Sequence, residues 1–356
     1  MYGQVIPEVS HHKHLGLILT NDCSWHEHVN YITEKAWTRV NIMRKLKMTI
    51  DRKSLETTYT SFVRPILEYA DVIWNNCTAF EKDQLDKIQN ECARIVTGAT
   101  RLVSLENLQR ETHWKSLENR RRDHRLILFY KMKKRLTPEY LQQLIPPPSA
   151  GASTQYNLRN PDFIRPVYSR TSQYFNSFLP ATIRDWNNLS TEIRNAPTLT
   201  SFKNLLKNNV NKTPKFYYTG NRRAQVLHAR LRMKCSSLNY HLFLRNIVES
   251  ALCQCGEVEN SHHFLFVCRA YDNCRISLLA SLVPITRNIC ETTLLFGSLI
   301  INIDFHCDMC CNILITPDIL LRFNLFICRW IISIFIIFHL FSFIDLFLSF
   351  STYFFL

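Results

Sequence analysis

Glycine is scarce in this chain, and lysine is absent from its last third. Seven glycines among 356 residues argue against glycine-rich phosphate loops and against repeat-type β architectures. The Walker, Gly-x-Ser-x-Gly and His-Glu-x-x-His patterns are also absent, which excludes the common signatures of nucleotide hydrolases, serine hydrolases and zinc proteases. The first 15 residues contain no apolar run, so we expect no secretory signal peptide.

Charge is distributed unevenly along the sequence. Residues 291–356 carry two basic and five acidic residues, whereas residues 1–290 carry 41 basic and 24 acidic residues. The last 34 residues contain 10 of the 23 phenylalanines. A basic body followed by an apolar tail favours a polyanionic partner for the body, most often nucleic acid. The alternative is a basic protein whose charge serves solubility alone.

The first 145 residues are predicted to be helical after two short strands within residues 1–20. Asp22 or Ser24 is expected to cap the helix that follows the strands. A second long helix is expected from about residue 113 to 135. Gly98 is placed to end a helix whose apolar residues recur at helical spacing, namely Leu85, Ile88, Cys92 and Ile95.

Residues after Pro146-Pro-Pro148 form a mixed segment followed by a basic helix. Helices are expected over 198–207 and 221–234, the second of them rich in arginine. A small core is expected from aromatic and apolar residues of the mixed segment, namely Tyr174, Phe175, Phe178, Leu179 and Trp186.

Cysteine and histidine cluster at one place in the chain with metal-ligand spacing. Cys253, Cys255, His263 and Cys268 form a C-x-C-x7-H-x4-C pattern, which offers four ligands for a closed, tetrahedral structural zinc site. Gly256 suits a tight turn after the second cysteine, and His263 and Cys268 are expected on one short helix. His262 competes with His263 for the third position. The alternative is a group of free thiols beside a core histidine.

Two other patterns are interpreted as incidental. His306, Cys307, Cys310 and Cys311 form a second cluster, but no further ligand set lies downstream at a sensible distance. Tyr69-Ala-Asp71-Val matches three of the four residues of the Tyr-x-Asp-Asp box that holds metal ions in reverse transcriptases, yet its second carboxylate is missing. Because two-metal phosphoryl transfer needs several converging carboxylates, Asp71 is interpreted as a polar residue at a helix end.

Several segments, in the same order, resemble the C-terminal half of reverse transcriptases of non-LTR retrotransposons of the LINE, jockey-like kind. The cysteine and histidine cluster resembles the zinc knuckle near the C-terminus of that family. The other segments that carry the resemblance are His12–Ile18, Ser24–His28, Tyr59–Trp74, Gln89–Gly98, Phe178–Asn188 and Ser201–Lys203.

The resemblance implies a mainly α fold with a helical thumb-like bundle, a short N-terminal β-hairpin, a mixed connector and a small zinc-knuckle module. It fades after residue 297, and the apolar sequence beyond predicts a helical tail. The expected domains are 1–145 (end-of-palm strand and thumb), 146–215 (Pro-rich linker and connector), 216–290 (basic helix and knuckle) and 291–356 (hydrophobic tail). The family's catalytic domain would precede residue 12. We therefore expect a truncated RNA-directed DNA polymerase relic that is inactive alone and carries no catalytic residue.

What the resemblance implies for function is non-specific binding of RNA and DNA as a template–primer duplex, with zinc as a structural cofactor. Arginine-rich helices can hold a phosphate backbone without reading sequence. The predicted contacts are Arg120, Arg121, Arg122, Arg125, Arg222, Arg223, Arg230 and Arg232. The alternative for each set is a solvated basic face. A structural zinc module that binds another protein is a further alternative.

The tail allows two interpretations. Trp330 to Leu356 contains no lysine or arginine, and a bilayer core needs about 20 mainly apolar residues, so 330–350 is predicted as a transmembrane helix. The chain would then be a membrane-anchored basic protein with a structural zinc module. Otherwise the tail is translated T-rich DNA outside the element's normal frame, and the protein is nuclear or cytoplasmic.

Overall fold

The computed structural model describes residues 8–148, 163–207, 213–273, 275–276, 280 and 289–296. They are mainly helical with one two-stranded antiparallel sheet, which confirms the expected fold class at this level. The predicted transmembrane helix 330–350 and the cluster at 306–311 lie outside the described residues. Within the described part, no helix combines the length and the apolarity that a membrane span requires.

The described residues form two compact units. The first comprises the described residues of Met1–Ala99 and Ser104–Thr213, and the second comprises Thr100–Val103 and the described residues from Pro214 onward. The first unit holds β1 (His11–His14), β2 (Leu17–Thr20), α1 (His26–Leu46), α2 (Arg52–Thr58), the π-helix η1 (Tyr59–Val63), α3 (Arg64–Glu68), α4 (Asp71–Trp74), α5 (Ala79–Thr97), α6 (Leu105–Thr112), α7 (Leu117–Lys133), α8 (Glu139–Gln142), α9 (Ser172–Phe175), α10 (Phe178–Asn187), α11 (Thr191–Arg194) and α12 (Leu199–Lys207).

The predicted pair of N-terminal strands forms a hairpin. β1 and β2 pair with His14 opposite Leu17, and a two-residue turn joins them. Both turn residues have positive φ (45° at Leu15 and 85° at Gly16), as a type I′ turn requires. A Cβ on Gly16 would also lie 3.2 Å from the ring of Tyr69. Glycine is therefore needed there for both conformation and space.

The N-cap predicted for the following helix is wrong. α1 begins after Trp25, which makes no side-chain capping bond. The Asp22 carboxylate instead accepts a hydrogen bond from the Ser24 backbone N–H at 2.9 Å. This short turn precedes the helix and uses the side chain that local sequence rules assign to the cap.

The long helix α5 follows its sequence signals closely. The side chains of Thr78 and Glu81 form a capping box at its start, which satisfies backbone N–H groups that the helix leaves open. Gly98 ends it with φ of 72°. The four apolar residues predicted to share one face are all buried, namely Leu85, Ile88, Cys92 and Ile95.

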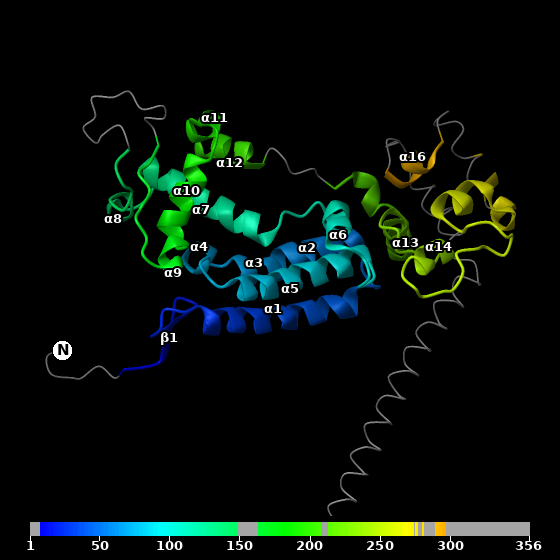
Figure 1. Cartoon of the computed structure of the whole chain (residues 1–356), viewed down its shortest axis with the longest axis horizontal. Coiled ribbons are helices and arrows are strands. Elements are labelled where there is room, and N and C mark those ends of the chain that lie inside the picture. Colours follow the sequence, from blue (N-terminus) through cyan, green and yellow to red (C-terminus); the bar gives the residue numbers. More distant parts are fainter. Residues whose placement is uncertain are drawn as a thin grey trace, which may run out of the picture. The chain divides into compact units, whose positions relative to one another are not determined.

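The first core lies between α1 and α5, which Figure 1 shows side by side with α2 and α3. α1 contributes a stripe of residues three or four positions apart, and burying each of the larger side chains stabilises the fold by roughly 1.5–3 kcal/mol. Trp74 is fully buried in the same cluster, and Trp25, Trp37 and Trp114 are half-buried against it. The buried apolar residues of the α1 stripe are Val29, Ile32, Ala36, Val40 and Met43.

The helix predicted from about residue 113 to 135 begins later than expected. A non-helical break at 113–116 separates α6 from α7. His113 terminates α6 in a left-handed conformation with φ of 56°, and the Ser116 hydroxyl then caps α7 by accepting from the Asn119 backbone N–H. The apolar periodicity continues across this region, but the cap residues divide it. The prediction missed the N-cap serine at position 116.

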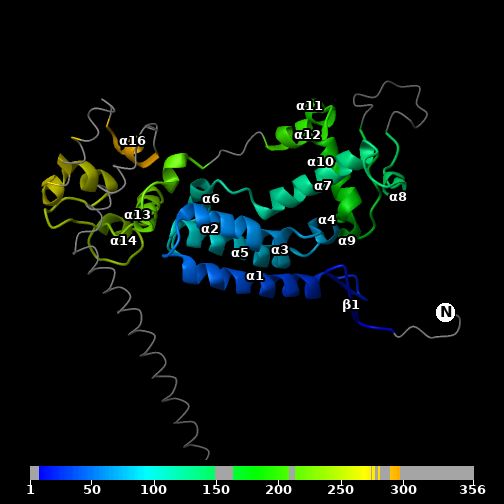
Figure 2. The same ribbon diagram turned by 180° about the vertical axis from the view of Figure 1, so that it is seen from behind.

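The connector packs on α7 through α10 and α12, as the view from behind in Figure 2 shows. Trp186 is 1% exposed and Leu179 packs against the same cluster, as predicted. The prediction is wrong for Tyr174 and Phe175, which are each 46% exposed. They lie on the one-turn helix α9, and the Arg184 guanidinium covers the Phe175 ring at 3.5 Å.

A partly buried ion pair joins α4 to α7. Asp71 is 2% exposed, and its carboxylate lies 2.7 Å from Nδ1 of His124. The hydrogen bond to this carboxylate raises the pKa of His124 above its ordinary value of 6.5. Asp71 begins α4, so it lies at a helix end, as the sequence predicts.

The His124–Asp71 pair predicts a pH-dependent stability. Because the folded-state pKa of His124 is raised, its contribution is complete below the unfolded pKa and is lost as pH rises through the folded pKa. Wild type should therefore exceed His124→Gln in thermal midpoint by more at about pH 5.5 than at about pH 9. His12→Gln, at an exposed position, is the control. An equal difference at both pH values would contradict this role.

The second unit contains the predicted basic helix. Its elements are the 3-10 helix η3 (Lys215–Tyr218), α13 (Arg222–Arg232), α14 (Asn239–Phe243), the π-helix η4 (His263–Val267), the 3-10 helix η5 (Arg269–Tyr271) and α16 (Glu291–Phe296). The Asn221 side chain caps α13 by accepting from the Ala224 backbone N–H. A core of its own lies under these elements and comprises Leu231, Leu238, Phe264, Leu265 and Leu295.

Candidate metal centre

The first two cysteines of the cluster lie on a tight turn. An isolated bridge pairs Leu252 with Val258, and between them the Cys253 backbone N–H donates to the Glu257 carbonyl at 2.7 Å. Gly256 has φ of 92° and donates its N–H to the Cys253 carbonyl at 3.0 Å. This conformation favours glycine, and it places both cysteine side chains on one turn.

The other two members of the cluster lie at the two ends of η4. His263 is its first residue and Cys268 is its C-cap, and the Cys268 backbone N–H donates to the His263 carbonyl at 2.8 Å. The Asn260 side chain accepts from the His263 backbone N–H at 2.8 Å. Sequence spacing predicted one short helix for this pair, and the structure shows a π-helical turn.

The four side chains converge. One ligand atom from each of Cys253, Cys255, His263 and Cys268 lies within 4.8 Å of all the others. The sulfurs of Cys253 and Cys268 are 3.6 Å apart, and Nε2 of His263 is 3.2 Å from the Cys255 sulfur. Zinc–sulfur bonds of about 2.3 Å in a tetrahedron place two sulfurs about 3.8 Å apart. The cluster can therefore hold a metal ion.

The structure places His263 in this group and His262 outside it. His263 is 4% exposed, whereas His262 is exposed and its ring lies 5.4 Å from that of Phe266. The two histidines are adjacent in sequence, but only His263 has Nε2 directed at a cysteine sulfur.

Burial and a neighbouring thiol raise the pKa of one member of the cluster, Cys268. Cys268 is 1% exposed, and burial, followed by the nearby Cys253 thiol, raises the pKa of Cys268 to about 12. Without a cation this thiol therefore keeps its proton at neutral pH. Metal binding requires thiolates and releases protons, so a soft divalent cation fits this donor set.

A buried arginine, Arg275, donates hydrogen bonds to the backbone that carries Cys268. Arg275 donates to the Leu265 carbonyl at 3.1 Å and also to the Cys268 carbonyl. Asp272 pairs with the same guanidinium at 2.9 Å. These bonds satisfy carbonyls at the end of η4 and fix the backbone that carries Cys268.

Of the four predicted nucleic-acid contacts on α7, three form ion pairs within the first unit and the fourth, Arg121, is buried. Arg120 forms a two-pronged ion pair with Glu68, with one contact at 2.9 Å. Arg121 is 1% exposed and lies 5.9 Å from the Trp74 ring centre. Arg125 donates to Asp185 at 2.7 Å, and Arg122 lies 3.6 Å from the same carboxylate. Of the four, Arg122 has the most exposed side chain, at 40%.

The arginines of α13 differ in exposure. Arg222 and Arg232 are buried, and the Arg232 guanidinium lies 3.7 Å from the Tyr217 ring centre. Arg230 is half-buried, and burial lowers its pKa. Arg223 is exposed. Arg223 is therefore the member of this set most accessible to a polyanion.

Sequence reasoning missed a group of cations that lie over aromatic rings on the α1 side of the first unit. The Lys13 ammonium lies 4.4 Å from the Tyr31 ring centre and the Arg39 guanidinium lies 4.1 Å from that of Phe62. Lys35 lies 5.8 Å from the same Tyr31 ring. Helical spacing of Tyr31, Lys35 and Arg39 was the available signal.

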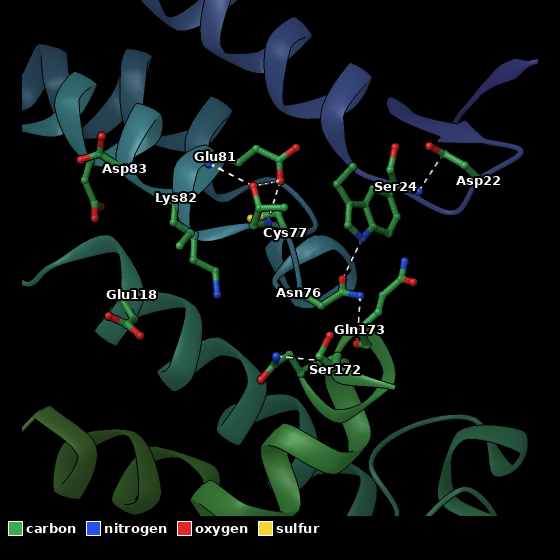
Figure 3. Close-up of a pocket in the computed structure, with 15 residues that line it drawn as sticks. Asp22, Ser24, Asn76, Cys77, Glu81, Lys82, Asp83, Glu118, Ser172 and Gln173 are labelled. Carbon is green, nitrogen blue, oxygen red and sulfur yellow. Dashed lines mark hydrogen bonds between the residues drawn. The ribbon is translucent and has the colours of Figure 1, made fainter. Parts of the chain in front are cut away.

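A pocket of about 800 Å³ in the first unit is lined mainly by acidic side chains, in contrast to these cations. Its lining, shown in Figure 3, comes from the loop before α1, the start of α5, α7 and α9. Trp25 donates to the Asn76 side chain at 2.7 Å and closes one wall. Lys82 is the one cation among five lining carboxylates, which disfavours phosphate here; the carboxylates are Asp22, Glu81, Asp83, Asp86 and Glu118.

Comparisons of the chain with protein-family models, with curated proteins and with solved structures find no match. The resemblance to LINE-type reverse transcriptases therefore stays a prediction.

Proposed function

We propose that this chain binds nucleic acid without sequence preference, in the manner expected of the thumb and zinc knuckle of a LINE-type reverse transcriptase, and that it has no polymerase activity of its own. The observation that carries the proposal is the convergence of Cys253, Cys255, His263 and Cys268 in the unit that also holds the basic helix α13. Zinc is the metal that this donor set favours.

The proposed metal site has a structural role. Three cysteines and one histidine complete a tetrahedral set, and such closed sites leave no position for a substrate. The turn at 253–257 and η4 are then held together, with Phe264 and Leu265 in the core beneath them. Zinc supplies folding free energy at this place when bound.

Charge supports a polyanionic partner. The excess of basic over acidic residues lies in residues 1–290, and exposed cations occur in both units, such as Lys35 and Arg223. Phosphate contacts of this kind position a protein on nucleic acid without reading its bases. The carboxylate-lined pocket lies in the first unit and marks a region that the phosphate backbone would avoid.

The absence of polymerase activity is proposed from the described carboxylates. Asp71, which follows the Tyr-Ala pair, is 2% exposed and bound to His124. Among the described residues, the Cys₃His cluster is the one place where three or more potential metal ligands converge. A two-metal polymerase centre needs converging carboxylates instead.

The proposal predicts binding that is independent of sequence. The full chain should bind two labelled RNA–DNA duplexes of unrelated sequence with dissociation constants within about threefold of each other, because phosphate contacts carry no base information. Replacing Arg223 with alanine should weaken both complexes alike and reduce the slope of log affinity against log salt concentration by about one. Arg223→Lys should keep both the affinity and the slope of wild type. A large preference for one sequence would contradict the proposal.

A further inference from the structure

We infer that Glu257 is a positioning residue for the Cys₃His site: its carboxylate orients His263 so that Nε2 faces the thiols and thereby strengthens metal binding. This inference rests on the metal site of the proposed function. It adds a residue that is not itself a ligand. It also states which ring nitrogen of His263, Nε2, binds the metal.

The two nitrogens of His263 have different partners. Nδ1 lies 3.1 Å from a carboxylate oxygen of Glu257, and Nε2 lies 3.2 Å from the Cys255 sulfur. An ionised carboxylate only accepts hydrogen bonds, so the contact with Glu257 places the proton on Nδ1. The lone pair of Nε2 is then free to bind a cation between the sulfurs.

Hydrogen bonds to the backbone of Glu257 and of His263 fix both ends of this contact. The Glu257 carbonyl accepts from the Cys253 N–H at 2.7 Å, and Asn260 accepts from the His263 N–H at 2.8 Å. The carboxylate therefore reaches the ring from a turn that itself carries two ligands. Such outer carboxylates orient metal-bound histidines and increase their basicity.

Glu257 is exposed, so a variant at this position tests its contact with His263 without disturbing the core. Its side chain is 64% exposed, so truncating it leaves no internal cavity. The nearby Glu259 is different: it is 5% exposed and accepts from the Asn239 backbone N–H at 2.9 Å. Glu259 therefore holds α14 in place, whereas Glu257 contacts the ring of a ligand.

The test measures zinc affinity of the full chain by competition with a chelating dye. Glu257→Ala should weaken zinc binding by about 10- to 100-fold. Glu257→Gln should lose less, because its amide oxygen still accepts from Nδ1. Glu249→Ala, an exposed glutamate of the same unit, is the matched control and should equal wild type. The metal-free variants should melt like metal-free wild type, since Glu257 acts through the metal.

The outcomes separate this inference from the proposed function. If wild type binds one zinc and Glu257→Ala binds it within about threefold as tightly, only the role of Glu257 is overturned. A loss that Glu249→Ala shares, or an altered melting of the metal-free chain, also overturns it. If wild type binds no zinc, the metal site and the inference both fail.

Discussion

Replacing Cys268 with serine should remove tight zinc binding from the full chain. A serine hydroxyl does not ionise at neutral pH and is not a zinc ligand, and the Cys268 sulfur lies only 3.6 Å from that of Cys253. Structural zinc contributes about 10–16 kcal/mol of binding free energy in zinc-finger peptides. The loss should therefore exceed the change of about 10- to 100-fold expected for an outer-shell residue. Metal content per chain, measured by mass spectrometry, checks this.

The matched control for Cys268→Ser is Cys23→Ser. Cys23 is exposed and lies in the first unit, so its replacement should leave one zinc per chain. Loss of zinc in both variants, or retention in both, would contradict the assignment of Cys268 as a ligand.

Replacing Arg52 with alanine should destabilise the first unit by about 3–5 kcal/mol. Arg52 is 0% exposed. Its guanidinium donates to the Glu111 carboxylate at 2.6 Å and to the Glu111 carbonyl at 2.9 Å, and it also pairs with Glu56 at 3.2 Å. Removing it takes the Arg52 cation away from the buried Glu111 carboxylate, which is 3% exposed. Urea-induced unfolding of the full chain, followed by circular dichroism, measures the loss.

Two variants test the cause of that loss. Arg110→Ala removes the exposed pair with Glu106 on α6 and should change stability by less than about 0.5 kcal/mol. The double variant Arg52→Met, Glu111→Leu removes both buried charges and should recover part of the loss. If the double variant is as unstable as Arg52→Ala, the loss of the Arg52–Glu111 charge pairing is not the reason.

Local signals predicted the elements whose determinants are close in sequence. The periodicity of α5 and its glycine stop at Gly98 depend on neighbours within one or two turns, and the structure has both. The Cys₃His cluster was also predictable, because its four members lie between residues 253 and 268. Glu257 was missed because spacing identifies ligands, not the groups that orient them.

The environment of the α7 arginines was not predictable from local patterns. Leu117, Arg121 and Arg125 lie four residues apart on one stripe of the helix, and all are buried. Periodicity rules assign charged residues to solvent, but α7 packs against α4 and α5 on one side and the connector on another. Their partners are distant in sequence: Glu68 lies 52 residues from Arg120 and Asp185 lies 60 from Arg125.

The salt dependence of nucleic-acid binding by the zinc-loaded full chain tests the proposed function most directly. Phosphate contacts release counterions, so the logarithm of the association constant should fall linearly with the logarithm of salt concentration. For six to ten contacts, affinity should drop by about 10³- to 10⁵-fold between about 50 and 200 mM salt. An association constant that does not change with salt, or no binding at low salt, would contradict the proposal.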